Sequence, residues 1–202
     1  MIYDVTVLTL RPGTTPRALP TLGKALEAHA ECMRACWYSD LGALNRIIIL
    51  TEHGASKQSD EVRHALAKDA NLFGIGEFIM SAAFDTFVQF SFMEKIQAGS
   101  VGPVFEVRTY SLKPDGLQKT MELWRKAVPG RVTLSPLLAA MYSVTGAARR
   151  FMHIWPYKSL DERQHIRAKS VEAGLWPPPG GPDHLVTMQS DIYLPAPFSP
   201  VR

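Results

Sequence analysis

Two kinds of hydrophobic spacing follow one another along the chain. Runs rich in Val, Ile, Thr and aromatic residues predict β-strands, and apolar residues spaced three and four apart predict amphipathic helices. The first half shows the order strand, helix, strand, strand, helix, strand, and the second half shows the same order. The expected ranges are 3–10, 15–30, 37–38, 47–50, 58–69 and 84–92, then 104–112, 117–127, 140–144, 149–155, 160–172 and 186–194. A further short helix is expected near 75–82.

The residues themselves repeat as well as the pattern. D-V-T-V-L-T-L-R-P-G at 4–13 is answered by E-V-R-T-Y-S-L-K-P-D at 106–115, and W-Y-S-D-L-G at 37–42 by M-Y-S-V-T-G at 141–146. A solenoid repeats every 20–50 residues, so this period is too long for one and fits a duplicated domain. We therefore expect one domain over residues 1–93, a linker over 94–103 and a second domain over 104–202.

The order βαββαβ defines the ferredoxin-like split unit, an antiparallel sheet with both helices on one face. Two such units predict an α+β protein in which the uncovered sheet faces lie against each other. The expected fold is thus a tandem of ferredoxin-like domains that forms a dimeric α+β barrel within one chain.

Two short segments mark where elements begin and end. Ser159 precedes the helix expected at 160–172, and Glu162 follows three residues later, which is the spacing of a capping box. The segment W-P-P-P-G-G-P at 176–182 contains too much proline for a helix or a central strand.

Composition and charge are those of an ordinary globular protein. Hydrophobic residues make up 46% of the chain and charged residues 20%, with a net charge of +3. The basic residues are scattered, so no nucleic-acid partner is expected. No apolar run approaches the ~20 residues of a membrane span, and the amino terminus enters a strand pattern without a targeting segment. The expected location is the cytoplasm.

Cys32 and Cys36 are expected near the end of the first helix as reduced thiols. A metal site would need two further ligands, and only His29 lies close in the sequence. No metal and no cofactor are therefore expected.

The second half carries five separated motifs: E-V-R-T-Y-S-L-K-P-D-G (106–116), L-W (123–124), L-S-P-L (134–137), H-I-W-P-Y-K-S-L-D-E-R (153–163) and I-Y-L-P-A-P-F-S-P (192–200). In these motifs and in their order the second half resembles the NIPSNAP family. The first half resembles the domain weakly, with Ile49 and Thr51 where His153 and Trp155 stand. The resemblance implies the dimeric α+β barrel superfamily, which includes small monooxygenases, haem-degrading enzymes and stress-induced binding proteins. It implies no defined activity for the NIPSNAP family itself.

Strand alternation divides the second-half sheet into two faces. Phe105, Val107 and Thr109 share one face, and the more apolar set is expected to face the helices. The polar and aromatic set is then expected to face the barrel interior as a ligand site. Its members are Glu106, Arg108, Tyr110, Tyr142, His153 and Trp155, with Asp191 and Tyr193 as neighbours.

This set combines an acid, a cation, a base that titrates near neutral pH and aromatic rings, the makeup of a small-molecule pocket. Arg108 suits a carboxylate or phenolate, and His153 suits proton transfer or, less readily, haem iron. A purely structural role is the alternative, in which Glu106 and Arg108 simply pair and the rings fill space. The matching first-half positions are smaller and mostly apolar: Asp4, Thr6, Leu8, Ile47, Ile49 and Thr51.

The sequence favours a protein that binds a small aromatic or anionic molecule between its sheets. The alternatives are a cofactor-independent monooxygenase-like enzyme and a non-catalytic interaction or scaffold protein. An enzyme predicts a cavity beside His153 and Arg108, whereas a scaffold predicts contiguous exposed apolar surface. No nucleophile elbow, P-loop or H-E-x-x-H motif is present. Assembly into a homo-oligomer is left open.

Overall fold

Eight antiparallel strands close into one barrel within residues 1–147 and 149–202, which the computed structural model describes. The first half contributes β1 (Ile2–Leu10), β2 (Met33–Leu41), β3 (Arg46–His53) and β4 (Ile79–Gln89). The second half contributes β5 (Val104–Leu112), β6 (Ala139–Ser143), β7 (Arg150–Tyr157) and β8 (Leu185–Pro195). Around the barrel the order is β1-β3-β2-β8-β5-β7-β6-β4.

The two halves meet at two strand pairs. β2 pairs with β8, and β4 pairs with β6, so each half supplies one continuous side of the barrel. Within each side the strand order is the same, with the first strand of the half between its third and fourth. The expectation that the two sheet faces cover each other in one chain is confirmed by this closure.

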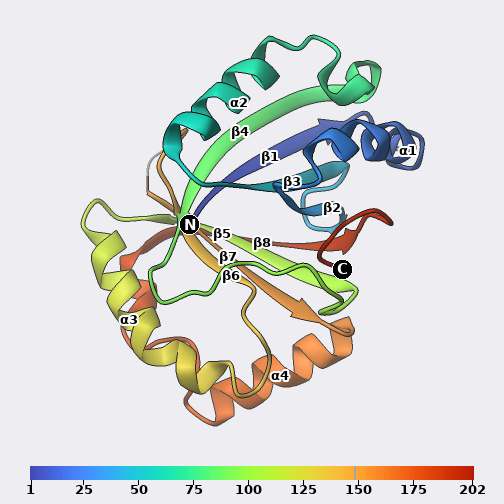
Figure 1. Ribbon diagram of the computed structural model, residues 1–202. Helices are drawn as coiled ribbons and strands as arrows, with labels where there is room; N and C mark the ends of the chain where they lie inside the picture. Colours follow the sequence, from blue (N-terminus) through green and yellow to red (C-terminus); the bar gives the residue numbers. More distant parts are fainter. Residues whose placement is uncertain (148) are drawn as a thin grey trace.

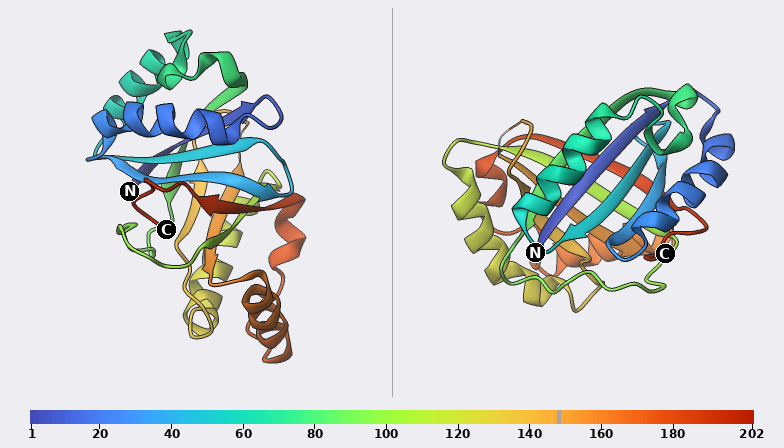
Figure 2. Two further views of the ribbon diagram at one scale, coloured as in Figure 1. Left: turned by 90° about the vertical axis from the view of Figure 1, so that its right-hand side faces the viewer. Right: turned by 45° about the horizontal axis from the view of Figure 1, so that its top comes forward.

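In the described part of the chain, four α-helices lie outside the barrel (Figures 1 and 2). Helices α1 (Thr15–Leu26) and α2 (Ser56–Lys68) cover the first half, and α3 (Gly116–Arg131) and α4 (Leu160–Glu172) cover the second. Each half thus has a layer of helices packed on the outer face of its strands. The lumen and the space beneath the helices are therefore two separate interiors.

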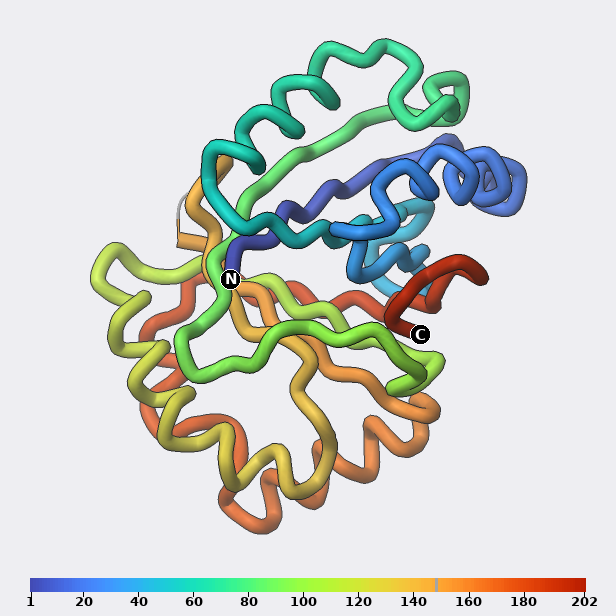
Figure 3. Tube along the Cα trace, in the orientation of Figure 1, coloured from blue at the N-terminus to red at the C-terminus, as the bar shows by residue number. Residues whose placement is uncertain are grey.

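One end of the lumen is filled and sealed. The Trp37 and Phe105 rings stack there at 4.3 Å between centroids. The segment 94–103 crosses this end beside the carboxyl-terminal residues, as the tube in Figure 3 shows. The Tyr3 hydroxyl accepts a hydrogen bond from the Ile96 amide at 3.1 Å, and Trp37 Nε1 donates to the Val201 carbonyl at 3.0 Å. The other end of the barrel stays open.

Several predicted elements are confirmed closely. The strand expected at 104–112 and the helix expected at 160–172 coincide with β5 and α4. Ser159 caps α4 as expected, because its Oγ accepts the Glu162 amide at 3.0 Å.

Two local expectations are wrong. The short helix expected near 75–82 is replaced by two single 3₁₀ turns, Leu72–Gly74 and Gly76–Phe78, followed at once by β4. Gly74 lies at φ 72°, a left-handed conformation that interrupts a helix. Cys36 lies on strand β2, buried beneath α1, and not at a helix end. Burial raises the pKa of its thiol.

Candidate functional site

The polar and aromatic set of the second half faces the helices, so its expected position in the lumen is wrong. Glu106 is paired with arginines of α4, and Trp155 packs in one cluster with Trp124 of α3. The lumen instead takes the other face of the same strands, including Phe105 and Val107.

The partners available on each side explain this orientation. A buried carboxylate is costly unless it is paired. Helix α4 brings Arg163 and Arg167, one turn apart, against the outer face of the sheet. On the lumen side of the same strand, Phe105 and Val107 belong to an apolar cluster. Glu106 therefore lies on the side of the helix.

Glu106 is the centre of a charged network. Its side chain is 0% exposed, and its Oε1 accepts from Arg108 at 2.7 Å, Arg163 at 2.5 Å and Ser190 at 2.8 Å. Arg167 Nη1 lies 3.9 Å from Oε2. Burial alone would raise the pKa of Glu106, but the Arg163 hydrogen bond and the Arg108 and Arg163 charges lower that pKa to about 2. Three guanidinium groups around one carboxylate leave an excess of positive charge.

His153 lies beside this network on β7, where it is directly opposite Arg108 in the strand register. Its Nδ1 accepts a hydrogen bond from Trp155 Nε1 at 2.7 Å. The indole is a donor only, so the imidazole proton is on Nε2. Burial, reinforced by the Arg108 charge, lowers the pKa of His153 well below its ordinary value and keeps the ring neutral.

Two buried polar atoms near His153 have no hydrogen-bond partner among the described residues. They are His153 Nε2 and the hydroxyl oxygen of Thr120 on α3. An unpaired buried donor or acceptor costs about 1–3 kcal/mol. Both residues line the same cavity.

This helix-side pocket has a volume of about 230 Å³ and lies between the second-half sheet and its helices. Its walls are largely aromatic. The Trp124 and Trp176 rings meet edge to face at 4.6 Å, and His153 stacks with Phe151 at 5.0 Å between centroids. The proline-rich segment 176–182 closes one side, and exposed Val171 and Met188 lie at the rim.

The candidate residues divide into three groups. Arg108, Tyr110 and His153 line the helix-side pocket. Glu106 and Trp155 lie behind it and hold Arg108 and His153, respectively, in place. Tyr142 does not line the pocket and packs near Phe90, with 6.3 Å between ring centroids. Asp191 and Tyr193, expected as neighbours, line the lumen instead.

The pocket residues that sequence reasoning missed include Thr120, Trp124, Arg167 and Trp176. Thr120 and Trp124 are four apart on α3, so they share one face of that helix. Arg163 and Arg167 have the same spacing on α4. An arginine pair on a helix face that packs on a sheet was the available signal for a buried carboxylate beneath it.

The same positions of the first half are packed with aliphatic side chains. Thr6 pairs with Ile49 as Arg108 pairs with His153. Leu8, Ile49 and Leu22 of α1 belong to one buried cluster. The polar lining is therefore a property of the second half.

Haem ligation does not fit the pocket. An iron atom would need the lone pair of His153 Nε2, but that nitrogen carries the proton because Nδ1 already accepts a hydrogen bond. No group of three or more His, Cys, Asp or Glu residues in the described part of the chain is placed to hold a metal ion. None of the described helices is long and apolar enough to cross a membrane.

Residues 105–200 match the NIPSNAP family model. A NipSnap homologue of Dictyostelium discoideum is 24% identical over 180 residues, which cover 87% of this chain and 78% of that protein. Protein NipSnap of Drosophila melanogaster is 23% identical over 156 residues, which cover 74% of this chain and 57% of that protein. This chain therefore spans little more than half of the Drosophila relative.

The whole fold also has a counterpart among solved structures. An anthrone oxidase-like protein superposes with a TM-score of 0.62 over 96% of this chain and 90% of its own, at 11% identity. At that identity the likeness concerns the fold, an antiparallel α+β barrel. Residues 105–200 are thus similar to the NIPSNAP family domain, and the chain as a whole is similar to NipSnap proteins.

Proposed function

We propose that the helix-side pocket binds a small aromatic anion. The observation that carries this proposal is the unpaired His153 Nε2–H at the wall of a cavity beside three arginines. A carboxylate or phenolate oxygen placed there would accept from His153 and gain from the excess positive charge. The proposal keeps the ligand class expected from the sequence and moves the site from the lumen to the space beneath α3 and α4.

The walls and the volume favour an aromatic ligand of one or two rings. Aromatic rings pair best edge to face or offset, and Trp124, Trp176 and Phe151 offer such surfaces. A volume of about 230 Å³ lies below the roughly 300–1,000 Å³ typical of sites for drug-sized ligands. Arg108 uses Nε and Nη1 for Tyr110 and Glu106, which fixes its plane and leaves Nη2 to the ligand.

Calorimetric titration of the purified chain with salicylate tests the proposal, with benzamide as the uncharged comparator. We expect saturable binding of salicylate and roughly tenfold weaker binding by Thr120→Val and by His153→Phe, because each removes one partner of the anion. Thr120→Val is nearly isosteric and removes a hydroxyl that is unpaired without ligand, so it keeps the fold. The matched control is Thr21→Val, an exposed threonine of α1.

Two results contradict this function. Equal affinity for salicylate and benzamide would show that the pocket does not recognise negative charge. Unchanged binding by both pocket variants would show that the ligand binds elsewhere. Native mass spectrometry of the protein as purified gives an independent check, since a retained aromatic acid would be seen directly.

A monooxygenase-like reaction is the second candidate. The cavity beside His153 and Arg108 is the feature expected of an enzyme, and the anthrone oxidase-like protein supports it through the fold alone. An oxygen electrode with anthrone as the probe separates the two candidates. Oxygen consumption that is lost in His153→Phe would favour catalysis over binding.

We also propose that the chain is a tandem of two ferredoxin-like domains, residues 1–93 and 104–202, joined by 94–103. The identical strand order of the halves supports this proposal. Matching registers support it too: Thr9 lies opposite Arg46 and Ser81, and Ser111 lies opposite Arg150 and Thr187.

A further inference from the structure

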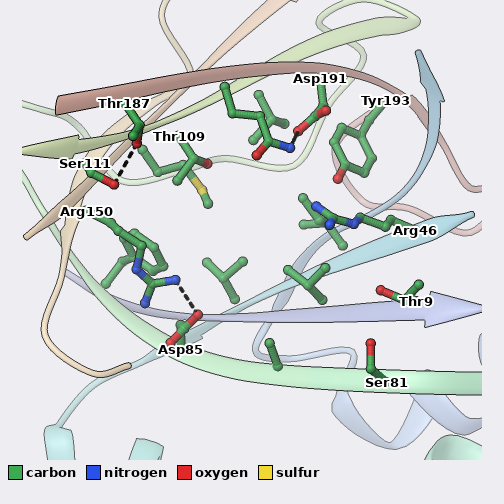
Figure 4. A pocket seen from close by; sticks show the side chains of 18 of the residues that line it. Thr9, Arg46, Ser81, Asp85, Thr109, Ser111, Arg150, Thr187, Asp191 and Tyr193 are labelled. Atoms are coloured by element: carbon green, nitrogen blue, oxygen red, sulfur yellow. Dashed lines mark hydrogen bonds and ion pairs between the residues drawn. The ribbon is translucent and has the colours of Figure 1, made fainter. Parts of the chain in front are cut away.

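The open end of the barrel contains a second cavity, on the opposite side of the sheet from the helix-side pocket. Its volume is about 530 Å³, and strands of both halves line it (Figure 4). Apolar side chains and charged or hydroxyl side chains both line it. The apolar part is formed by Val5, Val7, Ile48, Phe87, Val107 and Met152.

The polar residues of this lumen cavity occur as pairs, one from each half. Arg46 lies opposite Thr9 in the first half, and Arg150 lies opposite Ser111 at the equivalent position of the second half. Asp85 lies opposite Val5, and Asp191 lies opposite Val107, which are likewise equivalent positions. Two arginines and two aspartates therefore line the lumen cavity, and their charges balance.

Arg150 and Asp85 satisfy each other and their surroundings. Arg150 Nη1 lies 2.7 Å from Asp85 Oδ2, and its other nitrogens donate to the carbonyls of Thr145 and Ala147 at 2.9 Å each. Gly146 lies against this carboxylate, at φ 66°, and a Cβ there would come within 2.2 Å of Asp85 Oδ1. Arg150 thus connects the turn at 145–147 in the second half to Asp85 on β4 of the first half.

Asp191 is satisfied differently. Its Oδ1 accepts from the Ala43 amide at 2.8 Å, beneath Gly42, and its Oδ2 accepts from Gln189 Nε2 at 2.7 Å. The position that matches Gln189 in the first half is Ala83, which has no side-chain donor. By analogy with the Arg150–Asp85 pair, Arg46 would pair with Asp191. Gln189 instead donates a hydrogen bond to that carboxylate.

Arg46 is the arginine of the set that lacks a carboxylate partner among the described residues. Its guanidinium makes no ion pair with a carboxylate in the described part of the chain, whereas Arg150 does. Figure 4 shows its side chain directed into the same space as the Tyr193 hydroxyl. Burial raises the pKa of Tyr193, the Asp191 charge raises it further, and Arg46 opposes both. Tyr193 consequently keeps its proton and can donate it in a hydrogen bond.

From this arrangement we infer that the lumen cavity binds a medium-chain amphipathic carboxylate. Its carboxylate pairs with Arg46 and accepts from Tyr193, and its alkyl chain lies between Val7, Ile48 and Met152. These apolar lining residues favour an alkyl chain over a second charged group. The inference does not rest on the function proposed for the helix-side pocket, because the two sites share none of these polar residues.

Calorimetric titration of the intact chain with decanoate, below its micelle concentration, tests the inference, with decanol as the uncharged comparator. We expect one decanoate per chain, bound more tightly than decanol. Arg46→Gln is expected to weaken decanoate binding about tenfold or more and to bring it level with decanol. Val7→Phe is expected to weaken both by filling the place of the alkyl chain.

Two controls isolate the site. Arg11→Gln removes an exposed arginine beyond the end of β1 and is expected to bind decanoate as the unaltered protein does. His153→Phe alters only the helix-side pocket and is also expected to leave decanoate binding unchanged. Circular dichroism checks the fold of each variant.

Three results would overturn the inference. They are equal affinity of the unaltered protein for decanoate and decanol, unchanged binding by a folded Arg46→Gln, and loss of decanoate binding in His153→Phe. If Arg46→Gln does not fold, two measurements still test the inference: the comparison of decanoate with decanol, and the binding of both by Val7→Phe.

Discussion

Each half has a buried carboxylate on its first strand, Asp4 or Glu106, and the partners of that carboxylate determine the charge around it. Asp4 accepts from Ser59 at 2.7 Å and from Thr86 at 2.6 Å, and His53 Nε2 lies 3.0 Å from its other oxygen. Glu106 is instead held mainly by arginines. Arg63 Nη1 lies 4.0 Å from Asp4 Oδ1 and its Nη2 also pairs with Asp60, so one arginine there faces two carboxylates, whereas three arginines overcompensate Glu106. Only the second half therefore has a strongly cationic pocket wall.

The acid dependence of stability follows from Glu106. Its pKa falls from an ordinary 4.5 to about 2 on folding, so the carboxylate stabilises the fold above pH 4.5 and loses that contribution as pH falls toward 2. The shift corresponds to roughly 3 kcal/mol. Glu106→Gln is expected to be less stable at pH 7 and to lack this part of the acid dependence.

Urea unfolding at several pH values between 7 and 2.5 measures this effect. The stability difference between the two proteins is expected to shrink as pH falls below 4.5. Glu122→Gln, at an exposed position of α3, is the control and is expected to follow the unaltered protein. A stability difference between the two proteins that stays constant with pH would show that the charge of Glu106 does not contribute to folding stability.

At the scale of the elements, the second helix of each half begins differently. Ser159 caps α4 with an extended backbone at φ −160° and ψ 168°. Ala55 occupies the matching place before α2 with a similar backbone, φ −148° and ψ 152°, and makes no side-chain cap. An N-cap oxygen satisfies an amide that otherwise lacks an intrahelical partner.

Exchanging the two caps tests this difference. Ser159→Ala is expected to lower the free energy of unfolding by about 1 kcal/mol, and Ala55→Ser is expected to raise it by up to about 1 kcal/mol. Thermal and urea unfolding of both variants at pH 7 provide the measurement. A lower free energy of unfolding for Ala55→Ser would contradict a start of α2 at Ser56 with Ala55 as its N-cap.

At the scale of the whole molecule, the barrel belongs to neither half alone. The lumen core takes Trp37 and Phe87 from the first half and Phe105 and Tyr193 from the second. All four are at most 1% exposed. Separating the halves would expose this surface and the strand edges that pair β2 with β8 and β4 with β6.

A truncated chain of residues 104–202 is therefore expected to self-associate. Two copies could cover each other's sheet faces as the two halves do in the full chain, and failure to do so would lead to aggregation. Size-exclusion chromatography with light scattering measures the mass of the truncated and intact proteins. A folded, monomeric half would contradict the shared core. The same measurement decides whether the intact chain forms the homo-oligomer that the sequence leaves open.

The sequence by itself determined the order of the elements, the Ser159 cap and the closure of two sheets in one chain. These features depend on local periodicity, on side-chain chemistry within a few residues and on the repeat, all of which are visible in one dimension. Alternation along β5 likewise separated Glu106, Arg108 and Tyr110 correctly from their neighbours. It could not say which of the two sets faces the helices.

Only the tertiary structure decided that orientation. Glu106 is buried where Arg163 and Arg167 reach it from α4, more than fifty residues later in the chain. Arg46 is left without a carboxylate partner because Gln189, on a strand of the other half, donates to Asp191. A buried charge is stable only with its partners, and those partners come from distant segments that folding brings together. The two pockets are consequently properties of the folded barrel.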